Sequence, residues 1–206
     1  MVFMKKKWII ALIICFPSLF WIILESSTIN SKRLPFYGPK SIIEKDTVYY
    51  KAPAVFYDMV RKDSFSYPGS YIGVFIDESY RKDSYRLDGL WEYFNYNFEK
   101  IKELPFIFIF ENTNRITELK TFMKQPNFYF TNCTNFAATQ KSYYLKKPYY
   151  VDSSYFVLVD LNRHIRGYYD ARYIAEVKRL IDEYQHLRIK EEKQLLIEKN
   201  EIKQNP

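Results

Sequence analysis

Cysteine is scarce in this sequence. Only two cysteines occur among the 206 residues, and Cys15 lies inside an apolar run, which leaves Cys133 as the single thiol of the remaining chain. A disulfide within the globular part is therefore excluded, and so is redox chemistry that needs two thiols. We interpret Cys133 as a small apolar filler of the core rather than a reactive thiol.

Histidine and glycine are also few, with two and five residues respectively. His164 and His186 have no second metal-binding side chain at ligand spacing, so we interpret both as surface histidines. The sequence has no glycine-rich phosphate loop, and no G-x-S-x-G or H-E-x-x-H motif. We therefore predict that the protein is not an enzyme, holds no cofactor and takes no small-molecule substrate.

The chain has no dense basic stripe. Its formal charge is +7, and Lys5, Lys6 and Lys7 supply three of these charges, so 7 − 3 = +4 is spread over the rest. Nucleic-acid surfaces need clustered lysine and arginine next to exposed aromatic rings, and no such cluster is visible. The charge distribution argues against a nucleic-acid partner.

One long apolar run is present, at residues 8–24, with three lysines before it and Glu25 after it. Its length is near the lower limit of about 17 residues for a transmembrane helix. Lysine-rich flanks stay in the cytoplasm, so we expect a single-pass anchor with the following domain outside the membrane. A cleaved signal peptide and a buried core helix remain the alternatives.

The remaining sequence alternates strand and helix patterns. Continuous apolar runs or β-branched residues predict strands at 54–60, 71–76, 106–110 and 128–130, and a strand or extended arm at 41–51. Apolar spacings of three and four predict helices at 87–104, 114–124 and 135–145, and a long helix from 171 to about 199. A hairpin is predicted at 155–168, with Asn162 at positive φ in its turn. This order predicts an α/β, thioredoxin-like fold, a central mixed sheet flanked by helices.

These patterns divide the chain into five parts. We predict a cytoplasmic basic flank at 1–7, a transmembrane anchor at 8–24, a tether at 25–40, a thioredoxin-like domain at 41–189 and a charged, solvent-exposed helical extension at 190–206.

The C-terminal third carries a family resemblance. Residues 155–170 (YFVLVDLNRHIRGYYD), followed by the apolar helix positions Ile174, Val177, Leu180 and Ile181, resemble the last hairpin and helix of the Sco/SenC family. Residues 34–38 (LPFYG) resemble the juxtamembrane segment of some bacterial members. The family consists of thioredoxin-fold copper chaperones involved in cytochrome c oxidase assembly, so the resemblance implies that fold and a place on the outer side of a bacterial cytoplasmic membrane.

The resemblance also implies where copper ligands would be expected. Family members use a C-x-x-x-C pair after a central buried strand and a histidine before the last hairpin. In this chain the two cysteine positions fall approximately on Ser79 and Asp83, and the histidine position falls on Asp152 or Ser153. Copper(I) prefers thiolate and imidazole, so the expected site is lost, and thiol exchange with it. A copper chaperone that uses Cys133 and a histidine, and a single-cysteine redox protein, are the alternatives.

The loop after residue 76 combines charge with aromatic rings. Asp77, Glu78 and Asp83 suit a hard cation, but Arg81, Lys82 and Arg86 alternate with them and favour an exposed, self-neutralised loop. We expect exposed tyrosines at one end of the domain, Tyr143 and Tyr144 among them. The candidate surface for a protein partner in the membrane or periplasm consists of Tyr80, Arg81, Tyr85, Arg86, Tyr149 and Tyr150.

Overall fold

The computed structural model describes residues 34–43, 46–77, 103–112, 126–133, 135–152 and 155–204, together with Trp21. The chain divides into two compact units, residues 1–34 and 35–206. In the described part, no helix has both the length and the apolar character to cross a membrane. Of the predicted anchor at 8–24, all but Trp21 lies outside the described residues.

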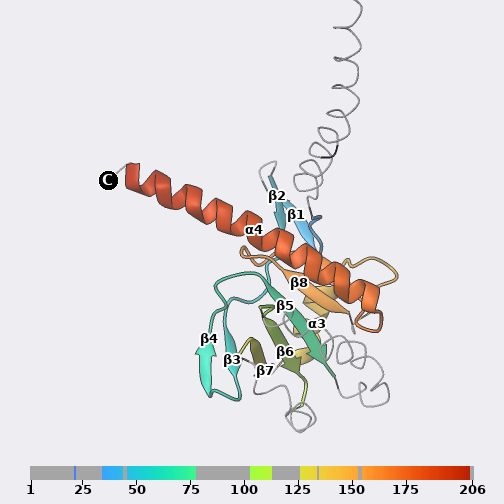
Figure 1. Cartoon of the computed structure of the whole chain (residues 1–206). Helices are drawn as coiled ribbons and strands as arrows, with labels where there is room; N and C mark the ends of the chain where they lie inside the picture. Colours follow the sequence, from blue (N-terminus) through green and yellow to red (C-terminus); the bar gives the residue numbers. More distant parts are fainter. Residues whose placement is uncertain are drawn as a thin grey trace, which may run out of the picture. The chain divides into compact units, whose positions relative to one another are not determined.

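A seven-stranded mixed sheet forms the centre of the second unit (Figure 1). Its strands, in spatial order, are β4 (Asp63–Phe65), β3 (Phe56–Asp58), β7 (Phe128–Asn132), β6 (Phe106–Phe110), β5 (Tyr71–Ile76), β8 (Phe156–Val159) and β9 (Ile165–Tyr169). Strands β5, β6 and β7 are parallel, and the other pairs are antiparallel. This arrangement confirms the predicted α/β class with a mixed central sheet.

The two central strands match their predicted bounds because their sequences are apolar throughout. Every residue of β5 (YIGVFI) and β6 (FIFIF) is buried, as expected for strands covered on both faces. Strand β7 continues past the predicted end at Phe130, since Thr131 and Asn132 still pair with Ile109 and Phe110. The short edge strand β4 was not predicted.

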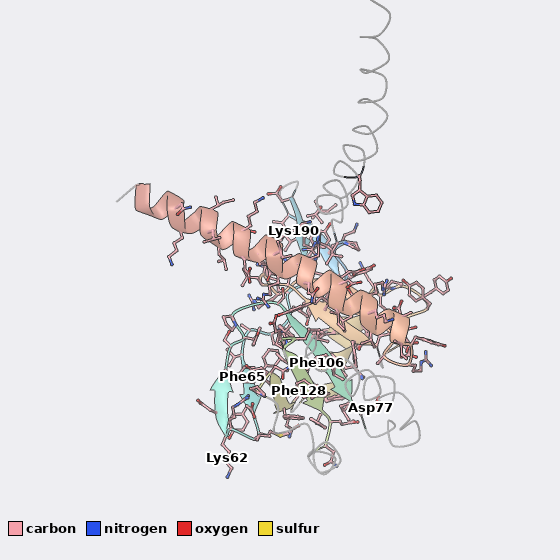
Figure 2. All side chains as sticks on the ribbon, viewed as in Figure 1. Lys62, Phe65, Asp77, Phe106, Phe128 and Lys190 are labelled. Carbon is pink, nitrogen blue, oxygen red and sulfur yellow. The ribbon has the colours of Figure 1, made fainter. Side chains whose placement is uncertain are left out.

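Among the described residues, one helix lies on each face of the sheet. Helix α3 (Phe136–Tyr144) packs on the face of Phe75, where its Tyr143 joins a core cluster. Helix α4 (Ile174–Gln204) lies on the other face, where its Glu183 accepts a hydrogen bond from the Tyr169 hydroxyl. Phenylalanines fill that second face: the rings of Phe108 and Phe130 stack at 5.3 Å, and those of Phe106 and Phe128 meet edge-on at 5.2 Å (Figure 2).

Residues 41–51 form a hairpin rather than one strand. β1 (Lys40–Ile43) and β2 (Asp46–Tyr49) pair in a separate two-stranded sheet. The polar sequence Glu44-Lys45-Asp46 separates the apolar residues of the two strands, and this interruption explains why the segment predicted as a strand or extended arm forms two paired strands.

The end of the predicted tether belongs to the compact unit, which begins at Pro35 rather than at residue 41. β9 is the edge strand of the sheet, and its exposed backbone groups need partners. Tyr37 N donates to Ile165 O at 2.9 Å, and Ala52 N donates to Arg163 O at 2.8 Å. The chain on both sides of the β1–β2 hairpin therefore covers this edge.

Two other predictions need correction. In the β8–β9 turn it is Arg163, with φ of 68°, that adopts the left-handed conformation and not Asn162, because Arg163 N donates to Asp160 O at 2.8 Å. Helix α4 begins at Ile174, since Asp170 holds residues 170–173 in a turn by accepting a hydrogen bond from Arg172 N. The helices predicted at 87–104 and 114–124 lie outside the described residues, apart from Glu103 and Leu104, which form a turn and a bend.

Candidate functional site

The copper ligands implied by the family resemblance would lie at the end of the sheet where its parallel strands finish. Because β5, β6 and β7 are parallel, their carboxyl ends meet there, and Glu111 N donates to Ile76 O at 3.0 Å while Cys133 N donates to Phe110 O at 3.4 Å. β8 runs antiparallel to β5, so the chain enters β8 from the segment containing Asp152 at the same end. Figure 2 shows Asp77 at the end of β5.

Most residues of the predicted site lie outside the described part of the chain. This group comprises Ser79, Tyr80, Arg81, Asp83, Tyr85 and Arg86. Asp152, at the approximate position of the family histidine, is described and half-buried. The sequence assignment of these positions therefore stays a prediction.

Cys133 lies just beyond β7 and packs against the core cluster on the α3 face. Its side chain is half-buried, and its Sγ lies 3.1 Å from the Thr139 hydroxyl of α3. A neutral hydroxyl partner does not stabilise a thiolate as a cation would. The geometry agrees with the interpretation of Cys133 as a small core residue.

Neither histidine lies near Cys133. His164 lies just before the edge strand β9, at the other end of the strands from Cys133. There Asp160 N, at the end of β8, donates to His164 O at 3.0 Å. Four strand spacings of about 4.8 Å separate β7 from β9, which is roughly 19 Å. His186 belongs to α4, on the sheet face opposite Cys133. Two ligands of one metal ion must lie within about 5 Å of each other, so this arrangement does not bring Cys133 and His164 together as ligands of one copper ion.

The part of the chain that the structure describes contains no group of three His, Cys, Asp or Glu side chains that could hold a metal ion.

His164 is not the surface histidine predicted from the sequence. Its side chain is only 17% exposed, because the rings of Phe36 and Tyr49 pack edge-on against it. Its Nδ1 lies 3.6 Å from Asp160 Oδ1.

Phe36 and Arg166 form a clamp between the start of the domain and β9. The Arg166 guanidinium lies over the Phe36 ring, 4.1 Å from its centroid, and Arg166 Nε donates to Pro35 O at 3.1 Å. The buried carboxylate of Asp160 accepts a 2.9 Å hydrogen bond from Arg166 Nη1. The two sequence segments that carry the family resemblance, 34–38 and 155–170, are therefore in direct contact, which no local sequence signal could show.

The expected group of exposed tyrosines is only partly present. Tyr149 is 98% exposed and Tyr150 is also exposed, so both are accessible at the surface. Tyr143 and Tyr144 are buried instead, contrary to prediction, because α3 turns them toward the sheet. The Tyr144 hydroxyl donates to Tyr155 O at 2.5 Å.

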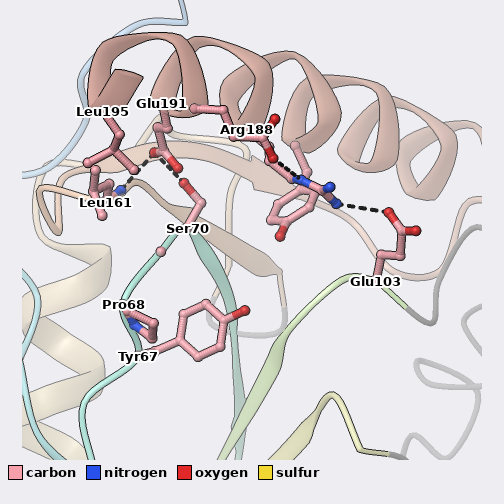
Figure 3. A pocket seen from close by; sticks show the side chains of 11 residues that line it. Tyr67, Pro68, Ser70, Glu103, Leu161, Arg188, Glu191 and Leu195 are labelled. Atoms are coloured by element: carbon pink, nitrogen blue, oxygen red, sulfur yellow. Dashed lines mark hydrogen bonds and ion pairs between the residues drawn. The ribbon is translucent and has the colours of Figure 1, made fainter. Parts of the chain in front are cut away.

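A pocket of about 270 Å³ lies between α4 and the loop before β5 (Figure 3). Glu191 Oε1 accepts hydrogen bonds from Ser70 Oγ at 2.5 Å and from Leu161 N at 2.8 Å. Arg188 pairs with Glu103 and with Glu192, each at 2.8 Å. Glu191, in the extension predicted at 190–206 to be exposed, thus joins α4 to the rest of the domain. Ser70 and Glu191 are 121 residues apart in sequence, so no local pattern predicts this contact.

No protein-family model matches the chain, and no curated protein matches it in sequence. Solved structures do match it. A SCO1/SenC family lipoprotein from Bacillus anthracis str. Ames superposes with a TM-score of 0.50 at 12% identity, covering 77% of this chain and 98% of that one. The thioredoxin domain of a thiol-disulfide oxidoreductase from Bacteroides vulgatus gives 0.41 at 16% identity, over 64% and 96%. BsSco, a member of the Sco family of cytochrome c oxidase assembly proteins, gives 0.43 at 13%, over 73% and 95%.

At these identities the likeness defines the fold. The chain has a thioredoxin-like α/β fold, and the resemblance to Sco/SenC proteins seen in the sequence is confirmed at the level of the fold.

Proposed function

We propose that this chain is a divergent Sco/SenC-type protein that acts through protein contacts, without copper binding or thiol-disulfide exchange. It is held on the outer side of a bacterial cytoplasmic membrane by residues 8–24. Its role is the assembly or maintenance of a membrane complex, with a respiratory oxidase as the first candidate. It is not an enzyme and has no cofactor.

The observation that carries this proposal is that, among the described residues, Cys133 has no second thiol or imidazole beside it to complete a copper or disulfide site. The sequence offers no second thiol in the domain, and the family ligand positions hold Ser79, Asp83 and Asp152. Hard oxygen ligands bind copper(I) poorly, and disulfide exchange needs a second sulfur. The wide separation of Cys133 from His164 removes the most direct substitute ligand pair.

The membrane part of the proposal rests on sequence. Residues 8–24 carry no charge and follow Lys5, Lys6 and Lys7, a pattern that keeps the N-terminus in the cytoplasm. The tether predicted at 25–40 follows the proposed anchor in sequence, and its last residues belong to the compact unit that begins at Pro35.

The proposed partner surface combines Tyr149 and Tyr150 with the loop residues Tyr80, Arg81, Tyr85 and Arg86. The rings of Tyr149 and Tyr150 meet edge-on at 5.5 Å in a surface position. Exposed tyrosine and arginine are common central residues of protein interfaces, and this favours a protein partner.

Complementation in the native cells tests this function. A deletion strain is supplied with the wild-type chain, with Cys133→Ser, or with Tyr149→Ser/Tyr150→Ser, and oxidase content is measured from the haem spectrum of the membranes. We expect the Cys133→Ser chain to restore oxidase like the wild type, and the double tyrosine variant to fail. Tyr173→Ser, which alters another exposed tyrosine, serves as the control.

Two results would contradict the proposal. If Cys133→Ser accumulates normally but fails to restore oxidase, the protein works through its thiol. If the deletion leaves every membrane complex unchanged, the assembly role is wrong.

A further inference from the structure

The β1–β2 hairpin exposes large apolar side chains that nothing in the described part of the protein covers. Ile42 is 79% exposed, Ile43 56% and Val48 43%. Ile42 pairs with Thr47, and Ser41 pairs with Val48, so Ile42 lies on one face of the hairpin and Val48 on the other. On the face of Ile42 the hairpin packs through Tyr49 on Phe36 and His164, whereas Ile43 and Val48 share the other, exposed face. A two-stranded hairpin is only marginally stable in water, so a further surface at its exposed apolar residues would stabilise it.

The sequence around the hairpin is basic. Residues 32–51 contain five basic and two acidic side chains, so the segment carries 5 − 2 = +3. The basic residues are Lys32, Arg33, Lys40, Lys45 and Lys51, and the acidic ones are Glu44 and Asp46. A positive segment with exposed isoleucines fits a surface that is negatively charged outside and apolar beneath, as an anionic phospholipid membrane is.

Chain connectivity brings such a surface within reach. The clamp of Arg166 on Phe36 fixes the point where the chain enters the domain, and the hairpin begins at Lys40, shortly after this point. Residues 25–34 separate the clamp region from the apolar segment at 8–24, and about ten residues extend at most roughly 36 Å. The hairpin is thus the first element of the domain after the proposed anchor.

We propose that the β1–β2 hairpin rests on the outer surface of the membrane that anchors the chain. The turn end of the hairpin, where Ile42 and Ile43 project from opposite faces, enters the level of the lipid headgroups, and the lysines contact the phosphates of anionic phospholipids. This inference rests on the anchoring stated in the proposed function. It gives the domain a fixed orientation, with the β9 edge toward the membrane and the β4 edge away from it.

Lipid contact at single sites tests the inference in the full-length chain. Cys15 and Cys133 are replaced by alanine, and Ile42→Cys is labelled with an environment-sensitive fluorophore. Ser64→Cys is the matched control, because Ser64 is exposed on β4, at the opposite edge of the sheet. Figure 2 shows Lys62 projecting outward beside this strand. Both proteins are reconstituted in vesicles of phosphatidylcholine and phosphatidylglycerol whose acyl chains carry bromine near the headgroup.

We expect quenching at position 42 to exceed that at position 64 by about twofold or more, as for a side chain at the interfacial depth. Quenching at position 42 should decrease in vesicles of phosphatidylcholine alone. Equal quenching at the two positions overturns the inference. A blue-shifted label at position 42 that bromine does not quench also overturns it, because a protein then covers the hairpin.

Flotation of the same vesicles separates this inference from the proposed anchoring. If the chain floats with the vesicles and position 42 stays in water, the hairpin inference is wrong and the anchoring stands. If the chain does not float, the anchoring is wrong and the hairpin inference falls with it.

Discussion

Tyr71 of β5 and Tyr143 of α3 share a hydrogen bond inside the core, with their hydroxyl oxygens 2.9 Å apart. Both side chains are buried, and the Tyr168 hydroxyl donates to Tyr143 O at 2.7 Å. Burial raises the pKa of both hydroxyls. A thioredoxin-like sheet and its helix are thus joined here by a neutral polar network within an apolar cluster.

Replacing Tyr143 by phenylalanine should destabilise the fold. The variant removes the partner of the buried Tyr71 hydroxyl, which costs about 1–3 kcal/mol in the free energy of unfolding. Urea unfolding of the detergent-solubilised chain, followed by near-UV circular dichroism, measures this cost. The double variant Tyr71→Phe/Tyr143→Phe should lose less than the sum of the two single variants. Strict additivity would show that the two hydroxyls do not interact, and Tyr149→Phe should change nothing.

Alkaline pH should unfold the protein over a narrow range. Burial raises the pKa of Tyr71, Tyr143, Tyr168, Tyr169 and Tyr184 above the ordinary value of 10.0. Above pH 10 the unfolded chain releases these protons while the folded chain retains them, so stability is complete below pH 10 and is lost as the pH rises. Each such tyrosine adds a slope of about 1.4 kcal/mol per pH unit.

Tyrosinate absorbance at alkaline pH checks this prediction. Ionisation of the buried tyrosines should coincide with the loss of far-UV circular dichroism, and Tyr71→Phe/Tyr143→Phe should make the transition less steep. Gradual ionisation near pH 10 in a protein that stays folded would contradict it.

Arg166→Ala should release the start of the domain. The variant removes the guanidinium that covers Phe36 and bonds Pro35 O, and it leaves the buried Asp160 carboxylate without this cation. Trypsin should then cleave at Lys40 about tenfold faster, since local opening by about 1.4 kcal/mol changes its population by this factor. Arg188→Ala, which affects only exposed ion pairs with Glu103 and Glu192, should leave the cleavage rate unchanged. Equal rates for both variants would mean that the clamp does not hold this segment.

Glu191 should hold the middle of α4 to the loop before β5 and the turn after β8. Glu191→Ala leaves the buried Ser70 hydroxyl and Leu161 N without their acceptor, and we expect faster amide exchange at Leu161 and a loss of about 1–3 kcal/mol. Glu191→Gln retains an acceptor oxygen and should lose less. Glu192→Gln alters an exposed carboxylate and is the matched control. Unchanged exchange in Glu191→Ala would show that the hydrogen bonds of Glu191 do not hold this part of α4.

Local sequence patterns were sufficient to predict the central strands and the last hairpin. The bounds of β5 and β6 follow from unbroken apolar runs, and the β8–β9 hairpin follows from two strand patterns separated by a short turn. Contacts between residues far apart in the sequence could not be predicted in this way. The pairing of Tyr37 with Ile165 places the end of the tether in the domain, and α3 buries Tyr143 against Tyr71.

For the candidate site, the sequence gives the identity of the residues but not their placement in space. The single thiol of Cys133 and the oxygen-bearing side chains at the family ligand positions follow from the sequence alone. The separation of Cys133, which follows β7, from His164, which precedes β9, by four strand spacings could be known only from the strand order. His164 was interpreted as a surface residue because Phe36 and Tyr49, which cover it, belong to another part of the sequence.

Copper(I) titration of the purified full-length chain, in competition with a chromophoric copper(I) chelator, tests the central claim most directly. The account predicts that the chelator keeps its copper and that Cys133→Ser behaves like the wild type, because one sulfur beside a threonine hydroxyl offers no chelating pair. Removal of one copper(I) ion per chain from the chelator by the wild-type protein would contradict the account.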